Sequence, residues 1–384
     1  MKICAIICEY NPFHNGHAYH IEKAKQLSGA DAVLCLMSGN FVQRGEAAIL
    51  DKYTRAKHAL YGGADIVLEL PTVFATSNAE LFAKGAISLL STIPAVTHLC
   101  FGAEHADAEE FLSLANLFND EPKEFSSTIK ELTATGMSYP KAYAVACEKA
   151  TGGKSVTSPN DILGLEYAKA ILKANASIQL LPISRTGSGY SDKKLSDGFA
   201  SATAIRERVR TGETETTLPY TPACVYQDLQ NAKTENRLPC MERTAILIKS
   251  KEQIQKTLDC TEGLENAFKA AARNTDDFIE VLTSARYTAS RLRRIALHNL
   301  LNIEESFIRE CLSSSLYLNP LAYNKERTDL LAALSEATIP FLSSGKQIKA
   351  LDGVAKACYE KDEFALDIYN AITNGTIAKE TIIL

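Results

Sequence analysis

The sequence of 384 residues lacks the features of membrane-embedded and disulfide-rich secreted proteins. No stretch reaches the roughly 18 uninterrupted apolar residues that a membrane-spanning helix needs. The apolar start ends at Glu9, which is too early for a secretory signal and predicts a buried first strand instead. The ten cysteines form no Cys-x-x-Cys pair and have mostly apolar neighbours, which predicts small buried side chains in a reducing cytoplasm.

The chain also lacks an excess of positive charge. Its 41 basic and 46 acidic residues leave a net charge of −5, which gives no global reason to expect nucleic acid, although a local basic cluster remains compatible with it. No His, Cys and carboxylate residues have the spacing of a metal site, so no metal ligands are predicted. With 46% hydrophobic and 23% charged residues, disorder is excluded and a folded globular protein is expected.

Apolar runs typical of strands alternate with helical segments in the first half of the chain. We expect strands at 2–8, 32–37, 65–70, 97–101 and 177–183. Continuous apolar strands separated by helices predict an α/β fold, a Rossmann-like, doubly wound parallel sheet with helices on both faces. Residues 105–157 have only helical patterns and are expected to be a helical insertion. A boundary near 215 would separate the α/β domain, 1–215, from a mainly α-helical region, 216–384.

The most informative stretch follows the first expected strand and reads Glu9-Tyr10-Asn11-Pro12-Phe13-His14-Asn15-Gly16-His17. Ligands of open parallel sheets bind beyond the carboxyl ends of the strands, and a helix start there favours phosphate. The imidazoles of His14 and His17 can donate to phosphate oxygens that gain charge in a transition state, each well-placed donor contributing about 3–4 kcal/mol. Ordinary loop histidines are the alternative, but the position between a strand and a helix favours a nucleotide.

A second element, Ser201-Ala202-Thr203-Ala204-Ile205-Arg206, opens a helix after the last of these strands. Capping of that helix would by itself explain the hydroxyls of Ser201 and Thr203. Combined with the first motif, the same hydroxyls and Arg206 are predicted to bind a triphosphate from the side opposite His14 and His17.

Together, the two motifs resemble the nucleotidyltransferase superfamily related to class I aminoacyl-tRNA synthetases, whose late motif reads Ile-Ser-Ser-Thr-x-Ile-Arg. Here Ala200 replaces the isoleucine and Ala202 the second serine. Further runs look like those of the bacterial tRNA(Met) cytidine acetate ligase family, in the expected order along nearly the whole chain: Met37 to Glu46, Gly63 to Pro71, Phe101 to Glu104, Ser158 to Asp161 and Arg286 to Arg294.

This resemblance implies an ATP-dependent ligase that activates acetate as acetyl-adenylate, releases pyrophosphate and transfers the acetyl group to N4 of the wobble cytidine (C34) of elongator tRNA(Met). Mg²⁺ is expected with the ATP from the chemistry of phosphoryl compounds. The catalytic residues would be His14, His17 and Arg206. The expected ATP contacts are Ile7, Cys8, Glu9, Tyr10, Asn11, Pro12, Phe13, His14, Asn15, Gly16, His17, His20, Gly102, Asn160, Arg185, Ser201 and Thr203.

The acetate needs cationic or amide donors close to the α-phosphate. Asn40 and Arg44, which follow the second expected strand, are the predicted substrate residues. Lys52 and Arg55 are further candidates, but a solvated helix face is the favoured interpretation for both. Glu46 would either pair with Arg44 or orient the cytosine amine, and the sequence leaves that choice open.

For RNA, the stretch from Val281 to Ile303 contains four arginines and no Asp or Glu. Clustered arginines without competing carboxylates suit phosphate contacts, and a neighbouring tyrosine can stack on an unpaired base. An amphipathic helix whose arginines only face water is the alternative. With the family resemblance, the predicted RNA contacts are Arg286, Tyr287, Arg291, Arg293 and Arg294.

Two other functions stay open at this point. The same fold could serve a nucleotidyltransferase that makes a dinucleotide or a CDP-alcohol without RNA, or a non-catalytic nucleotide-sensing RNA-binding protein. The first leaves the arginine-rich stretch unexplained, and the second predicts degraded phosphate motifs, whereas both histidines, Gly16 and Arg206 are intact. Whether the chain forms a homo-oligomer is also left open.

Overall fold

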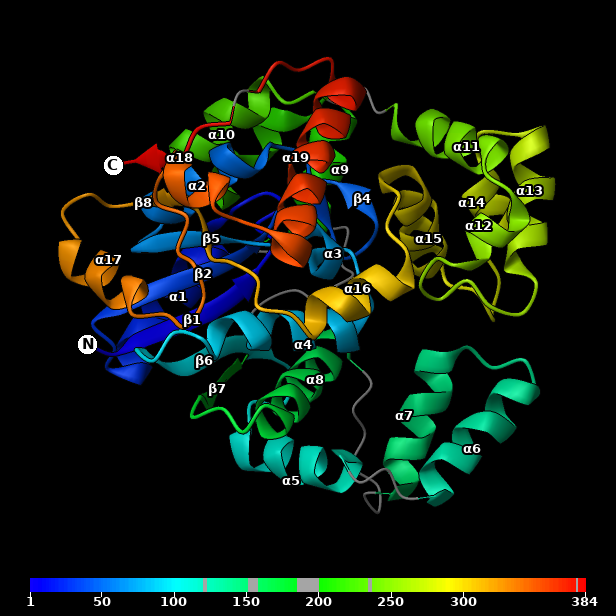
Figure 1. Ribbon diagram of the computed structural model, residues 1–384, viewed down its shortest axis with the longest axis horizontal. Helices are drawn as coiled ribbons and strands as arrows, with labels where there is room; N and C mark the ends of the chain where they lie inside the picture. The colour runs from blue at the N-terminus through cyan, green and yellow to red at the C-terminus, as the bar shows by residue number, and fades with distance from the viewer. Residues whose placement is uncertain (120–122, 151–157, 185–199, 234–236, 378) are drawn as a thin grey trace.

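A seven-stranded sheet lies at the centre of the computed structural model (Figure 1), with the strand order β7-β6-β1-β2-β5-β8-β9. The structure describes residues 1–119, 123–150, 158–184, 200–233, 237–377 and 379–384. Neighbouring strands are parallel from β7 to β5, with the bounds β7 (Gln179–Ser184), β6 (Val96–Ala103), β1 (Ile3–Cys8), β2 (Ala32–Ser38) and β5 (Ile66–Leu70). The predicted doubly wound α/β fold is therefore confirmed.

Alternate residues of the strands enter two apolar cores, one on each face of the sheet. Leu34 and Leu36 of β2 pack with α4 (Ala79–Leu90), α5 (Ala108–Asn119) and α8 (Pro159–Lys173). Cys35 and Met37 enter the other core, whose helices are α1 (Asn15–Ser28), α2 (Lys52–Tyr61), α9 (Ala202–Arg210) and α10 (Ala223–Gln230). Because both faces are covered, the strands can be apolar throughout, which is the pattern that the sequence shows.

Two helical parts extend from the sheet. The hairpin of α6 (Lys123–Ala134) and α7 (Tyr139–Ala150) lies within the stretch expected to be a helical insertion. A separate lobe, which we call the α11–α15 lobe, has its own apolar core (Figure 1). Its helices are α11 (Leu238–Ile248), α12 (Lys251–Gln255), α13 (Leu264–Asn274), α14 (Phe278–Leu282) and α15 (Ala289–Leu301).

The chain then returns to the sheet, which the sequence does not predict. Strand β8 (Asn319–Tyr323) pairs antiparallel with β5, and β9 (Ile382–Ile383) pairs with β8. The expected boundary near residue 215 therefore does not separate the sheet from all that follows. Pro320 lacks a backbone N–H and made the short β8 run look like a loop. Helices α16 (Glu305–Leu312), α17 (Thr328–Ser335), α18 (Gly345–Lys349) and α19 (Gly353–Thr373) accompany these strands. Within the described ranges, no helix combines the length and the apolar character required to cross a bilayer.

Candidate active site

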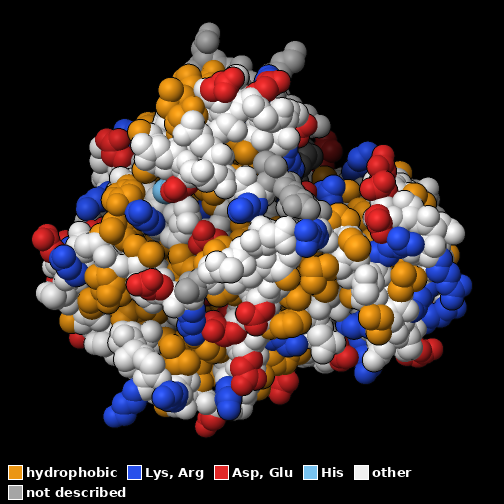
Figure 2. Space-filling model, turned by 90° about the horizontal axis from the view of Figure 1, so that it is seen from above, with side chains coloured by type: hydrophobic (Ala, Val, Ile, Leu, Met, Phe, Trp, Pro, Cys, Tyr) orange, Lys and Arg blue, Asp and Glu red, His pale blue; other side chains and the backbone are white. Residues whose placement is uncertain are grey.

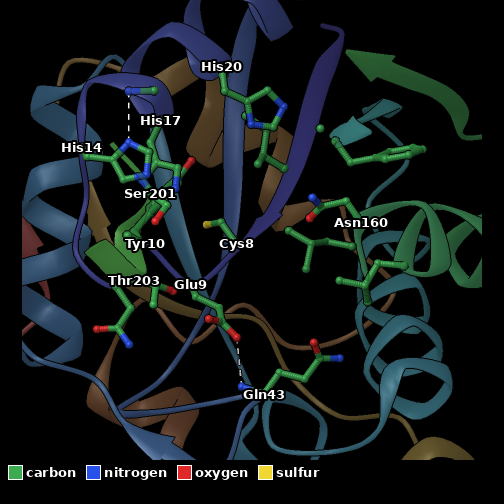
Figure 3. A pocket seen from close by; sticks show the side chains of 18 of the residues that line it. Cys8, Glu9, Tyr10, His14, His17, His20, Gln43, Asn160, Ser201 and Thr203 are labelled. Atoms are coloured by element: carbon green, nitrogen blue, oxygen red, sulfur yellow. Dashed lines mark hydrogen bonds between the residues drawn. The ribbon is translucent and has the colours of Figure 1, made fainter. Parts of the chain in front are cut away.

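A cavity of about 290 Å³ lies at the carboxyl ends of the central strands (Figure 3). Its wall is built from the end of β1, the starts of α1, α8 and α9, and the loop after β2. Most of the residues predicted to hold ATP or acetate line it, namely Ile7, Cys8, Glu9, Tyr10, Asn11, His14, Gly16, His17, His20, Arg44, Gly102, Asn160, Ser201, Thr203 and Arg206. Segments up to about 200 residues apart in sequence thus form one wall.

The N-termini of three helices face this cavity. His14 caps α1, Ser158 caps α8 by accepting from Asp161 N–H at 3.0 Å, and Ser201 caps α9 by accepting from Ala204 N–H at 3.1 Å. Amide N–H groups and the positive end of the helix dipole favour an anion at such positions. Their convergence makes the cavity suited to a polyanionic ligand.

The two histidines of the first motif lie against each other on this wall. Their rings stack with centroids 3.7 Å apart. The Nδ1 of His14 accepts from the backbone N–H of Gly16 at 3.1 Å, so this nitrogen carries a lone pair and the proton of the neutral ring sits on Nε2. A ring in this tautomer can donate from Nε2 to a phosphate oxygen.

Arg206 connects α9 to the loop after β1. Its guanidinium donates to the backbone oxygen of Asn11 at 2.5 Å and to Thr203 Oγ1 at 3.2 Å. Burial lowers the pKa of Arg206 from its usual value, although Glu46 and Glu9 oppose that shift. The late motif is therefore tied physically to the early one, across 195 residues of sequence.

The opposite side of the cavity is more apolar. Phe101 and Tyr167 line it with ring centroids 5.6 Å apart in an edge-to-face arrangement, and Leu163 lies beside them. Asn160 lines the cavity here and donates to Glu104 Oε1 at 2.9 Å. An aromatic wall with a polar residue at its edge is suited to a nucleobase. The sequence motifs contain no signal for Tyr167 or Leu163.

Glu9 is a carboxylate in this otherwise anion-binding wall. Its Oε1 accepts from the backbone N–H of Gln43 at 2.9 Å (Figure 3). Burial raises the pKa of Glu9, while the positive charges of Arg206, Arg44 and Arg55 act in the opposite direction.

Several predicted contacts do not lie at the cavity. Phe13 is fully buried beneath Gly62, and Asn15 donates to the backbone oxygen of Pro219 at 3.0 Å. Pro12 is also absent from the wall. Asn40, the predicted acetate contact, is buried and accepts from Lys52 N–H at 2.8 Å through its Oδ1. These residues shape the loops that carry the cavity wall. Arg185 lies outside the described residues.

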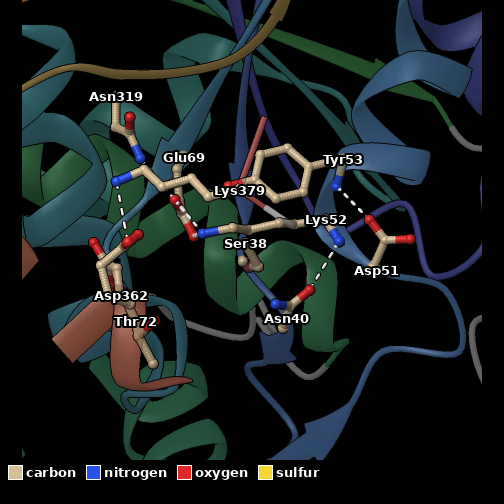
Figure 4. A network of polar contacts seen from close by, with 12 residues as sticks. Ser38, Asn40, Asp51, Lys52, Tyr53, Glu69, Thr72, Asn319, Asp362 and Lys379 are labelled. Carbon is tan, nitrogen blue, oxygen red and sulfur yellow. Dashed lines mark hydrogen bonds and ion pairs between the residues drawn. The ribbon is translucent and has the colours of Figure 1, made fainter. Parts of the chain in front are cut away.

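The predicted solvated face of α2 is wrong. Lys52 is 1% and Arg55 0% exposed. The Nζ of Lys52 lies 2.7 and 2.8 Å from the two carboxylate oxygens of Glu69 on β5 (Figure 4), and Asn319 Nδ2 of β8 donates to the same carboxylate at 2.9 Å. Glu69 lies 17 residues from Lys52 in sequence, and Asn319 lies 250 residues from Glu69. A local sequence pattern therefore cannot predict these contacts.

Arg55 is likewise held inside the protein. Its guanidinium donates to the backbone oxygens of Leu50 at 2.9 Å, Glu9 at 2.5 Å and Ser38 at 3.2 Å, and also to that of Gly39. It therefore fastens the ends of β1 and β2, from which the cavity loops begin.

The acid-free arginine stretch acquires carboxylates from elsewhere in the fold. Arg286 pairs with Glu262 at 2.7 Å. Arg291 donates to the backbone oxygen of Asp259 at 3.1 and 2.7 Å and to Thr261 Oγ1 at 2.9 Å. These contacts give Arg291 a structural role in the α11–α15 lobe, whereas the side chain of Arg286 remains 49% exposed.

The next two arginines join α15 to the loop after β2. Arg293 pairs with Glu46 Oε1 at 2.7 Å, a partner that neither interpretation of Glu46 included, and the guanidinium of Arg294 donates to the backbone oxygen of Gln43 at 3.4 Å. Arg294 also lies 3.6 Å from Asp259 Oδ2 within the lobe. Gly45 has a φ of +71° and packs against the backbone of α15 so closely that a Cβ there would lie 2.6 Å from Arg294 N. One loop therefore contacts both the cavity, through Arg44, and α15.

Comparisons with known proteins agree over nearly the whole length. The family model described as HIGH Nucleotidyl Transferase matches residues 1–381. The tRNA(Met) cytidine acetate ligase of Caldanaerobacter subterraneus subsp. tengcongensis is 36% identical over 99% of this chain and 98% of its own, and that of Thermoanaerobacter sp. is 37% identical over 98% and 97%.

Solved structures lead to the same group. The apo crystal structure of Thermotoga maritima TmcAL superposes with a TM-score of 0.91 at 31% identity, covering all of both chains. The form of that protein bound with alpha-thio ATP has a TM-score of 0.88 at 29% identity, again over both full chains.

Proposed function

The chain belongs to the HIGH nucleotidyl transferase family and, within it, to the tRNA(Met) cytidine acetate ligases, and from this premise we propose its reaction. It activates acetate with ATP, forming acetyl-adenylate and pyrophosphate, and transfers the acetyl group to N4 of the wobble cytidine of elongator tRNA(Met). The observation that carries this proposal is the cavity where three helix N-termini and the two histidines meet, in a chain similar to these ligases from end to end.

In this proposal, ATP occupies the cavity. His14 and His17 donate to phosphate oxygens, Ser201 and Thr203 bind the triphosphate from the start of α9, and the adenine lies against the aromatic wall near Asn160. The other ATP contacts in this proposal are the remaining predicted residues that line the cavity, apart from Glu9, whose carboxylate has the same charge as the phosphates. Mg²⁺ would arrive with ATP, held by phosphate oxygens and water, because among the described residues no three His, Cys, Asp or Glu side chains are grouped to hold a metal ion.

Arg44 is the residue that we propose for the acetate carboxylate. It lines the cavity on the loop after β2, together with the helix starts that would hold the phosphates. Asn40 would act through the shape of this loop, because its side chain is buried and accepts from the backbone N–H of Lys52 at the start of α2.

For the tRNA, we propose contacts at Arg286, Tyr287 and Arg293. The side chains of Arg286 and Arg293 are 49% and 40% exposed, and Arg286 lies over the ring of Tyr287 at 5.7 Å. Arg291 and Arg294 would stabilise that surface through their contacts with Asp259 rather than bind RNA themselves. In Figure 2, charges of both signs are interspersed over most of the visible face, and Lys and Arg gather at the outer edge of the α11–α15 lobe. Such a distribution suits a small RNA contact area.

The proposal is tested by incubating the protein with ATP, labelled acetate and total tRNA. Label in tRNA(Met) together with release of AMP is the expected result. Formation of a dinucleotide or CDP-alcohol without AMP would instead favour a transferase, and ATP binding without turnover would favour a sensor. A cytoplasmic location remains a prediction from the sequence, which leaves homo-oligomerisation open.

A further inference from the structure

The position of Glu9 needs an explanation that phosphate binding does not supply. It lines the cavity immediately after β1, between residues that are suited to an anion. In the close-up view, its side chain lies next to Gln43, below His14, His17 and Ser201 on one side and Asn160 on the other (Figure 3). A carboxylate at this place repels a triphosphate and so weakens ATP binding. Its presence on the wall therefore favours a role in another step of the reaction.

The carboxylate is held in place but not fully satisfied. Its Oε1 accepts from Gln43 N–H at 2.9 Å, and in the part of the chain that the structure describes no hydrogen-bond donor contacts its Oε2. An anchored carboxylate with one oxygen available on a cavity wall can accept a proton from a substrate held there. Burial raises the pKa of Glu9, which makes the carboxylate a stronger base than a carboxylate in water.

The second half of the proposed reaction requires such an acceptor. The exocyclic amine of cytosine is a weak nucleophile, because its lone pair is delocalised into the ring. When this nitrogen attacks the carbonyl carbon of acetyl-adenylate, the new C–N bond leaves a positive charge on nitrogen. The charge is removed only if an N–H proton departs, while the C–O bond of the mixed anhydride breaks and AMP leaves with the electron pair.

We propose that Glu9 is the proton acceptor for this transfer: its Oε2 takes the proton from N4 of the cytidine as the acetyl group moves from the adenylate to nitrogen. The proton is then released to water. This inference rests on the proposed function, and it adds a residue for a step to which the phosphate-binding motifs contribute nothing.

The experiment separates the two halves of the reaction in Glu9→Gln. Glutamine keeps an oxygen that can accept from Gln43 N–H but cannot take up the proton. Adenylate formation is measured with ATP, acetate and hydroxylamine, whose strongly nucleophilic nitrogen converts acetyl-adenylate to acetohydroxamate without a protein base. Transfer is measured under single-turnover conditions with labelled acetate and tRNA(Met). We expect hydroxamate formation within about threefold of the unmodified protein and acetyl transfer slowed by about 100-fold or more.

Two further variants control the result. Glu9→Asp keeps a carboxylate and should recover part of the transfer rate. Glu22→Gln changes an exposed carboxylate on α1, away from the cavity, and should leave both halves unchanged. The transfer rate of the unmodified protein should rise with pH through the raised pKa of Glu9, and this rise should vanish in Glu9→Gln. The positive charges that act on Glu9, namely those of Arg44, Arg55 and Arg206, persist over that range. The histidines on the same wall, His14, His17 and His20, are identical in both proteins, so the comparison with Glu9→Gln isolates the contribution of Glu9.

The outcomes distinguish this inference from the proposed function. If the unmodified protein yields neither hydroxamate nor acetylated tRNA, the proposed function is wrong. If it yields both and Glu9→Gln transfers at a normal rate, Glu9 is not the acceptor. Equal loss of both halves, with a raised KM for ATP, would assign Glu9 to nucleotide binding and overturn the inference as well.

Discussion

The cavity and helix α15 are each marked by a short sequence pattern, but the fold uses the two sets of residues differently. His14 and His17 line the cavity wall, in line with their spacing. The arginines of α15 and its N-terminal flank contact carboxylates and carbonyls of the same chain, with Glu46 lying 247 residues from its partner Arg293. A site formed at one helix start can therefore be predicted from the local sequence. The net charge of a surface cannot, because it depends on residues that the fold brings together.

The largest expected effect tests the cavity. His17→Ala removes a donor that would stabilise the charged phosphate oxygens in the transition state, so acetyl-adenylate formation should fall by about 100- to 1,000-fold. The measurement is acetohydroxamate formation with saturating ATP and acetate. His98→Ala, on β6 away from the cavity, is the matched histidine control and should retain the unmodified rate. A normal rate in His17→Ala would show that His17 does not act on the phosphates, and the cavity would then not be the functional half of the comparison with α15.

The next effect tests whether Arg291 is structural. Arg291→Ala removes three hydrogen bonds from a charged donor, and the free energy of unfolding should fall by about 2–3 kcal/mol, measured by urea denaturation. Arg286→Ala breaks an exposed ion pair with Glu262 and a contact with the ring of Tyr287, so its unfolding free energy should stay closer to that of the unmodified protein than that of Arg291→Ala does. If Arg291→Ala were fully stable and lost tRNA affinity instead, helix α15 would bind RNA as its composition alone suggests.

A third prediction concerns His298, which is buried in α15 against Thr76 at 2.8 Å. Burial and the charge of Arg294 lower the pKa of His298 to about 3, against 6.5 for a free histidine. As the pH falls below 6.5, the unfolded chain takes up this proton and the folded one does not, so the stability contributed is lost progressively towards pH 3. At pH 5 the loss is about 2 kcal/mol relative to neutral pH.

His298→Gln should remove this pH dependence while keeping a partner for Thr76. The check is the difference in unfolding free energy between pH 7 and pH 5, which should be about 2 kcal/mol smaller in the variant. An unchanged difference would mean that His298 titrates normally and that this end of α15 is open to water.

The smallest effect addresses the exposed arginines. The double variant Arg286→Ala, Arg293→Ala should weaken tRNA binding by about tenfold and reduce the slope of log affinity against log salt concentration by about two, one for each phosphate contact. Filter binding over a series of salt concentrations measures both quantities. An unaltered slope would place the RNA elsewhere on the molecule.

Sequence reasoning predicts most of the sheet and most of the cavity wall for a physical reason. Apolar strands buried on both faces are continuous in sequence, and helix starts carry their own capping residues, such as Ser201. The motif as a whole is a less reliable guide to its single members. Phe13 and Asn15 lie within it but support the loop from behind, because successive residues of a turn point in different directions.

The failures share one cause, which is a partner distant in sequence. Lys52 and Arg55 look like a charged helix face until Glu69 and the carbonyls of two strand ends are placed beside them. Strand β8 has no local signal because Pro320 interrupts its pattern and its partners, β5 and β9, are distant in sequence. In each case the tertiary contact, not the local pattern, determines the environment of the residue.

The loop after β2 has a consequence for timing. Gly45 leaves no room for a side chain against α15, while the backbone N–H of Gln43 holds Glu9 and Arg44 lines the cavity. If RNA binding displaced α15, the loop after β2 would have to move with it, because the two are packed without a gap. The displacement would then reach the cavity, since Gln43 and Arg44 lie in the same loop. An enzyme that makes an unstable anhydride gains from such a linkage, because the intermediate is exposed to hydrolysis only while it waits for its acceptor.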